Sequence, residues 1–288
     1  MKNFNYQRGF TLVELVMVIV IMGVIGGIVS VFMKSPIDAY FASARRAALT
    51  DTADTTMRRM ARDIQRALPN SIRTPSNQCV EFIPTKTGGR YRAEGVGALD
   101  FAAASTSFNM LGSNTTFAGG SIPADQQIGS GDVIVVYNLG IPDSDAYQQT
   151  GLVNTAAVQP TVAASGTVTS PEIIIPIAST QFPLASGSNR FHVVPSGVKN
   201  IVAYVCNSAK ELHRTTRAFD PPGCATSGTC PATCPATGPI LARNVSACNF
   251  DYSGSDLQRN ALIRMTLQLT DAGEAVNLMH EVHVSNTP

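Results

Sequence analysis

Glu14 is the residue whose chemistry stands out, because it is the one charged residue in the apolar run from Phe10 to Met33. A carboxylate in an apolar segment is costly to desolvate unless a cation meets it, and such residues are functional by default. We therefore expect Glu14 to form a charge pair with a cationic group that this segment does not itself supply.

Six cysteines could form disulfides or bind a metal. Zinc bound by Cys224, Cys230, Cys234 and Cys248 is the alternative, but their spacing lacks the paired two-residue knuckles of zinc sites. An even number of cysteines in an exported segment favours disulfides. We predict disulfides, no metal and no cofactor, with the pairing left open. The disulfide candidates are Cys79, Cys206, Cys224, Cys230, Cys234 and Cys248.

Catalytic motifs do not account for this chain. His280 and His283 resemble the pair of a zinc protease motif, but they are three residues apart in a predicted strand, so they would point to opposite faces. The sequence has no Gly-x-Ser-x-Gly elbow and no phosphate-binding Gly-Lys loop. We therefore expect that the protein is not an enzyme and that energy for moving it comes from another protein.

A short basic leader precedes the apolar run. Lys2 and Arg8 lie in it, it ends at Gly9, and no small-residue cleavage site follows the apolar segment. The arrangement resembles the class III signal of type IV prepilins and pseudopilins. That resemblance implies cleavage between Gly9 and Phe10 by a prepilin peptidase, N-methylation of Phe10, and subunit assembly through Glu14 and the amine of Phe10. The leader would be residues 1–9.

An ordinary membrane anchor is the alternative for the same segment. Roughly 24 residues at 1.5 Å each give about 36 Å, enough to cross a bilayer, and the basic leader would stay cytoplasmic. This alternative explains the length but not Glu14, nor the string Gly9-Phe10-Thr11-Leu12-Val13-Glu14.

Composition argues against a nucleic-acid partner. The net charge is +1 and charged residues make up 14% of the chain, whereas a nucleic-acid binder would carry a concentrated basic excess. The chain is long enough to bury a substantial core, which we expect to be one large domain on a helical stalk.

The N-terminal helix is predicted to continue beyond the membrane. We divide it into a transmembrane and assembly half, 10–35, and an amphipathic half, 36–69. Pro36 could kink it, and Pro69 and Pro75 are predicted to end it. Arginines on the other face are expected to be solvated or to meet acidic neighbours. The apolar stripe comprises Ile37, Tyr40, Phe41, Ala44, Ala48, Met57, Met60, Ile64 and Leu68.

The remainder, 70–288, is predicted as a globular β-rich domain, because its periodicity changes to two-residue alternation. Asp271 to Glu274 supply a turn between the last two strands, and 102–130 and 150–170 are loops or short strands. The fold class is α+β, with a long N-terminal helix packed on an antiparallel sheet. The predicted strands are 132–138, 172–177, 198–206, 261–270 and 275–284.

A narrower resemblance covers scattered stretches of the chain. Residues 79–84, 88–93, 244–250 and 280–288 resemble MshO-type minor pilins of the mannose-sensitive haemagglutinin type IV pilus, which are related to J-type minor pseudopilins of type II secretion. The fold this implies is the pilin fold. Residues 100–170 carry no such resemblance.

The resemblance implies a minor pilin that initiates pilus assembly or sits at the tip. Its partners would be other major and minor pilins, and an inner-membrane assembly platform driven by a separate ATPase. The protein would sit in the inner membrane with its globular part in the periplasm, and on the pilus after assembly. The alternatives are a type II secretion pseudopilin, and a pilus-borne subunit for adhesion or ligand binding.

Overall fold

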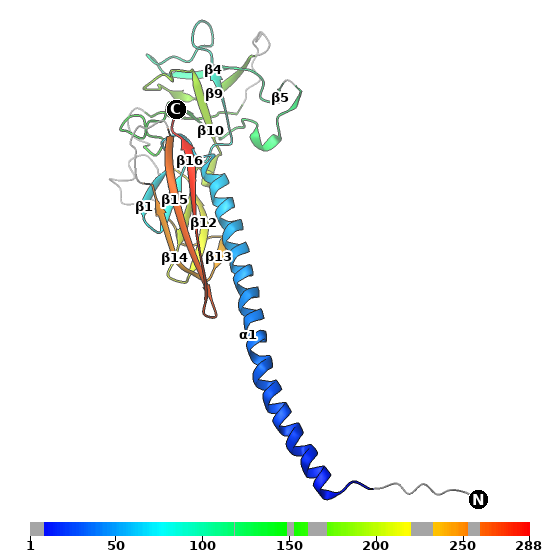
Figure 1. Ribbon diagram of the computed structural model, residues 1–288. Coiled ribbons are helices and arrows are strands. Elements are labelled where there is room, and N and C mark those ends of the chain that lie inside the picture. Colours follow the sequence, from blue (N-terminus) through cyan, green and yellow to red (C-terminus); the bar gives the residue numbers. More distant parts are fainter. Residues whose placement is uncertain (1–8, 118, 149–152, 161–171, 220–232, 253–259) are drawn as a thin grey trace, which may run out of the picture.

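A computed structural model of the chain describes residues 9–117, 119–148, 153–160, 172–219, 233–252 and 260–288. It contains one long helix, α1 (Leu12–Ile64), whose N-terminal half projects away from the β-rich part (Figure 1). The predicted α+β architecture of a long N-terminal helix and antiparallel sheets is confirmed.

Helix α1 runs through Pro36 without interruption and ends at Ile64. The prediction that Pro69 ends it was wrong by about one turn, because the chain leaves the helix to join a strand. The Leu68 amide donates to the Ile83 carbonyl at 2.7 Å, and the Thr85 amide donates to the Arg66 carbonyl at 2.8 Å. These long-range hydrogen bonds compete with the next helical turn.

Only the C-terminal part of the predicted apolar stripe packs against the protein's own sheets. Ile37, Tyr40 and Phe41 are exposed, as are Ala44 and Ala48, so this part of the stripe is not covered by the chain's own described sheets. Burial begins where the sheets first reach the helix. The buried helix residues are Leu49, Ala53, Thr56, Met57, Met60, Ala61 and Ile64.

Two sheets and the upper half of α1 form the body of the molecule, which encloses one apolar core. The first sheet has five antiparallel strands. In spatial order they are β1 (Arg73–Ser76), β2 (Cys79–Phe82), β11 (Ile201–Cys206), β12 (Glu211–Arg217) and β13 (Ile240–Arg243).

The second sheet of the body comprises β14 (Val245–Asp251), β15 (Asn260–Asp271) and β16 (Glu274–Ser285). The predicted C-terminal hairpin is confirmed, since Asp271 pairs with Glu274 across the turn. The predicted alternation on β15 is also confirmed. The buried β15 residues of that face are Ile263, Met265, Leu267 and Leu269.

A six-stranded antiparallel sheet forms a second unit beyond the end of α1 (Figure 1). Val158 bridges to Ile177, and the Gln159 amide donates to the Pro176 carbonyl at 3.0 Å, so the two sheet edges meet and close a barrel. Around the barrel the strands are β8 (Thr155–Ala157), β7 (Val133–Val136), β10 (Arg190–Val194), β3 (Thr87–Tyr91), β4 (Ser105–Leu111) and β9 (Glu172–Thr180).

Side chains fill the barrel interior, as in other small barrels. Phe108 and Phe191 meet edge to face there, with ring centroids 5.2 Å apart. In the chain, the barrel lies between β2 and β11, which are hydrogen-bonded neighbours in the body. It is therefore an insertion into the body, and the described part of 70–288 has one large apolar core in the body and another in the barrel.

The barrel is fixed to the body by apolar and amide contacts. Leu68, Ile83 and Val135 belong to a buried apolar cluster between the two units. Beside it, Asn138 donates to the Pro69 carbonyl at 2.7 Å, and Asn70 donates to the Asn138 carbonyl at 2.9 Å. These buried amides hold the barrel at a fixed place above the helix end.

All five predicted strands are present, within about three residues at each end. Residues 102–130 were predicted to be loops or short strands. The structure places four short elements among the described residues there: β4, β5 (Thr116–Phe117), β6 (Gly120–Ser121) and the 3-10 helix η1 (Ala124–Gln126). A second 3-10 helix, η2 (Gly197–Lys199), occupies the start of the predicted strand 198–206. Residues 161–170 lie outside the described residues.

Candidate functional site

The N-terminal half of α1 is the first candidate site. Every residue from Leu12 to Met33 is exposed, although nearly all of them are apolar. Within the part of the chain that the structure describes, α1 is the one helix long and apolar enough to cross a membrane. Such a surface needs lipid or other apolar helices around it.

Glu14 forms a capping box with Thr11 at the start of this helix. The Thr11 amide and the Thr11 hydroxyl both donate to Glu14 Oε2 at 3.0 Å, and the Glu14 amide donates to Thr11 Oγ1 at 3.3 Å. The two residues thus satisfy two of the amides that a helix start leaves unpaired. The carboxylate is held within one turn of Gly9 and Phe10.

The sequence reasoning missed this capping role. The signal was present, because Thr11-x-x-Glu14 immediately before an apolar run is the capping-box pattern. Gly9, Phe10 and Glu14 therefore lie together at one helix end, and Thr11 joins them.

The arginines of α1 divide into paired and unpaired ones. Arg58 pairs with Asp54 at 2.7 Å, and Arg46 pairs with Glu274 at the tip of the β15–β16 hairpin at 2.7 Å. Arg59, Arg62 and Arg66 have no ion-pair partner among the described residues. The last three are spaced three and four residues apart, so they share one face of the helix.

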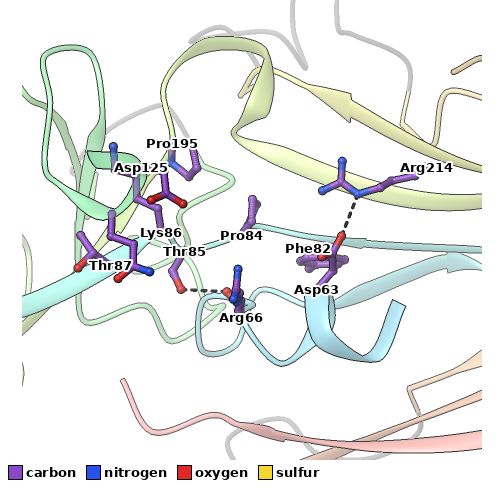
Figure 2. A pocket seen from close by; sticks show the side chains of 11 residues that line it. Asp63, Arg66, Phe82, Pro84, Thr85, Lys86, Thr87, Asp125, Pro195 and Arg214 are labelled. Atoms are coloured by element: carbon purple, nitrogen blue, oxygen red, sulfur yellow. Dashed lines mark hydrogen bonds and ion pairs between the residues drawn. The ribbon is translucent and has the colours of Figure 1, made fainter. Parts of the chain in front are cut away.

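A cleft of about 440 Å³ lies where the helix end, β2, β12 and the barrel meet (Figure 2). Asp63 and Arg214 point toward one another on one side, and Lys86 and Asp125 lie on the other. Arg214 Nε donates to Asp63 Oδ2 at 2.8 Å, and Lys86 pairs with Asp132 at 2.6 Å. These two ion pairs account for four of the charges at the cleft, and Arg66 and Asp125, which also line it, add one charge of each sign.

Glu81 is a fully buried carboxylate at the edge of the body. Arg73 donates to its Oε2 at 2.7 Å, and the Cys234 amide donates to its Oε1 at 2.8 Å. Arg217, itself almost buried, lies 3.3 Å from the same carboxylate. Burial alone would raise the pKa of Glu81, but the amide of Cys234 and the two guanidinium groups together hold that pKa below its usual value.

Two disulfides confirm the prediction for four cysteines. Cys79 is joined to Cys234, and Cys206 to Cys248, with Cα separations of 6.2 and 6.6 Å. The second bridge links the two sheets of the body. Cys224 and Cys230 lie outside the described residues. Two members of the zinc alternative, Cys234 and Cys248, are therefore in different disulfides, and the described residues contain no group of three or more metal-ligating side chains.

Comparison with known families matches the N-terminal segment alone. Residues 4–30 match the family described as the prokaryotic N-terminal methylation motif. This match supports a type IV prepilin-like protein, and it covers the leader, Phe10, the capping box and most of the exposed apolar segment. No curated protein and no solved structure matches the chain.

Proposed function

We propose that this protein is a minor pilin of a type IV pilus, of the MshO type, that enters the assembly through packing of α1. The main support is the methylation motif, which lies on a helix whose apolar half, Leu12 to Met33, is not buried by the described part of the chain. A prepilin peptidase would cleave after Gly9 and methylate Phe10. Before assembly the helix would span the inner membrane with the body and barrel in the periplasm.

Glu14 would select the axial position of the incoming subunit. Both hydrogen bonds from Thr11 go to Oε2, and Glu14 Oε1 accepts none from the described residues. Oε1 is therefore available to the cationic, methylated amine of Phe10 on an adjacent subunit. In the apolar interior of a helix bundle, that attraction would be far stronger than in water.

The rest of α1 supports lateral contacts between subunits. Tyr40 and Phe41 are exposed below the body, with their rings edge to face and centroids 5.8 Å apart. They lie beyond the segment expected in the bilayer, so neighbouring stalks in a filament are their natural cover. Other major and minor pilins would supply those stalks, and a membrane platform with its own ATPase would supply the energy.

The barrel supports a low-copy position at or near the tip. It is inserted between β2 and β11 and lies at the end of the molecule farthest from the membrane-spanning half of α1 (Figure 1). A bulky distal unit is easier to place at the end of a filament than at every step of a repeating lattice. We propose a structural and assembly role with no enzymatic activity.

Complementation of a deletion strain tests this proposal. Glu14→Gln removes the charge but keeps a residue that can complete the capping box. Thr11→Val is the matched control, because it removes the hydroxyl of the capping box and keeps the carboxylate. We expect Glu14→Gln to be cleaved and stable in the membrane yet depleted from sheared pili, with fewer or shorter pili on the cells. The Thr11→Val variant should be incorporated far better.

Wild-type pilus number with Glu14→Gln present in the sheared fraction would contradict the charge-pairing role. The same deletion strain separates the pilus from the secretion alternative. Loss of pili with normal export of secreted enzymes supports the minor pilin. Normal pili with failed secretion would support a type II secretion pseudopilin instead.

A further inference from the structure

A second cleft, of about 330 Å³, lies on the outer surface of the barrel over β3 and β10. Gly88, Gly89 and Leu111 line it together with two arginines and a histidine, and no acidic residue takes part. Gly88 pairs with His192 across the strands. A Cβ atom on Gly88 would lie 2.9 Å from the Phe191 carbonyl oxygen, so only glycine fits this close backbone approach.

Two arginines lie side by side in this cleft. Arg90 and Arg190 are direct cross-strand partners on β3 and β10, and both are exposed. Like charges directly opposite one another weaken a sheet. Neither guanidinium has an ion-pair partner among the described residues, whereas Arg92, two positions along from Arg90, pairs with Glu172. The fold therefore neutralises Arg92, just past the end of β3, and leaves Arg90 and Arg190 uncompensated.

His192 adds a second polar feature with no partner. Its Nε2 atom is buried and has no hydrogen-bond partner in the described part of the chain. Burial and the nearby charge of Arg190 lower the pKa of His192 to about 4, so the ring is neutral at pH 7. His192 is therefore a neutral neighbour of the two guanidinium groups in this cleft.

We propose that the cleft binds a small organic oxyanion, of the size of one acidic sugar. Guanidinium groups bind carboxylate and sulfate oxygens through paired N–H donors, and two of them would offset a full negative charge. Leu111, 47% exposed beside Arg90, would contact its apolar side. The volume is at the lower end for small-molecule sites, which favours a small ligand over a protein surface.

Calorimetry on the full-length protein in detergent tests the site. The probes are galacturonate for the carboxylate and glucose 6-sulfate for the sulfate, with galactose as the neutral control. Either acidic sugar should bind while galactose does not. Arg90→Gln and Arg190→Gln should each weaken that binding about tenfold or more, since each removes a charge-assisted contact.

Arg264→Gln is the matched control variant, because it removes an exposed β-strand arginine of the body and leaves the cleft intact. It should change the affinity less than twofold, which would exclude a general charge effect. Both cleft variants should melt at the same temperature as the parent protein or higher, because each relieves a repulsion. Failure of both acidic sugars to bind, equal binding of galactose, or equal losses in Arg264→Gln would overturn the proposal.

A second readout follows His192 directly. Labelled histidine Cε1 signals of the four histidines can be titrated by nuclear magnetic resonance. A bound anion should raise the pKa of His192 and leave the other three unchanged. An unchanged His192 pKa at saturating galacturonate would contradict a ligand in this cleft. The site is separate from α1, so these measurements can fail while the pilus role stands, and the reverse also holds.

Discussion

Tyr204 and Asp63 tie the first sheet of the body to the last turn of α1, because the Tyr204 hydroxyl donates to Asp63 Oδ2 at 2.6 Å. Tyr204 is fully buried, and burial raises the pKa of its hydroxyl above the usual value. Arg214 donates to the same oxygen, so one carboxylate joins β11, β12 and the helix. The stalk is thereby fixed to the body at the height where the barrel begins.

Tyr204→Phe should destabilise the full-length protein by about 1 to 2 kcal/mol, because the half-buried Asp63 carboxylate loses one of its two side-chain donors. Denaturant unfolding in detergent, followed by circular dichroism, measures the change. Tyr40→Phe is the matched control, since Tyr40 is 72% exposed. Equal stability of the two variants would show that the hydroxyl does not tie the helix to the sheet.

Acid should unfold the body partly through Glu81. Its folded pKa is lowered, so its contribution to stability is present at neutral pH and is lost as the pH falls through that folded pKa, below about 4.5. Glu81→Gln should cost about 3 kcal/mol at pH 7, because Arg217 keeps its charge without the buried partner. The variant should also show a flatter dependence of melting temperature on pH between 3 and 7.

Glu281→Gln is the control for that experiment, because Glu281 forms an exposed ion pair with Arg264. Surface pairs of this kind contribute less than about 1 kcal/mol. A pH profile for Glu81→Gln that parallels the parent protein would indicate that other carboxylates govern acid unfolding.

The disulfide between Cys206 and Cys248 should stabilise the body by about 4 kcal/mol on the loop-entropy estimate, since it closes a loop of 42 residues. The double variant Cys206→Ser and Cys248→Ser should lose most of this in denaturant unfolding. Peptide mapping without reductant should recover the Cys206–Cys248 and Cys79–Cys234 pairs. Other pairings, or stoichiometric zinc with thiols protected only until chelation, would contradict the bridges.

Processing of the leader gives the fourth prediction. Mass spectrometry of protein from cells with an active prepilin peptidase should find a chain that begins at methylated Phe10. Gly9→Val should keep the leader, because the peptidase requires the small residue before the cut. A wild-type chain that starts at Met1 without methylation in those cells would rule out the proposed processing and favour a plain membrane anchor.

Local patterns were enough to predict α1, the prepilin-type N-terminal methylation motif and the C-terminal hairpin. The apolar run after Gly9 is continuous, and the alternation on β15 repeats every two residues, so neighbours in sequence carry the information. The cap formed by Thr11 also has a local signal, the Thr11-x-x-Glu14 spacing before an apolar run. The five predicted strands were likewise recognisable from local two-residue alternation.

Contacts between distant residues decided the rest. Closure of the barrel depends on Val158 meeting Ile177, and the burial of Glu81 depends on Arg217, 136 residues away. The pairing of Cys79 with Cys234 spans 155 residues, which no spacing rule reaches. Arg90 and Arg190 look like ordinary surface residues until strand register places them side by side. The sequence alone determined the helix, its N-terminal methylation motif and the strands with regular alternation, because these depend on neighbouring residues. Only the tertiary structure decided sheet order, disulfide pairing and the oxyanion cleft, because each depends on register between segments far apart in the chain.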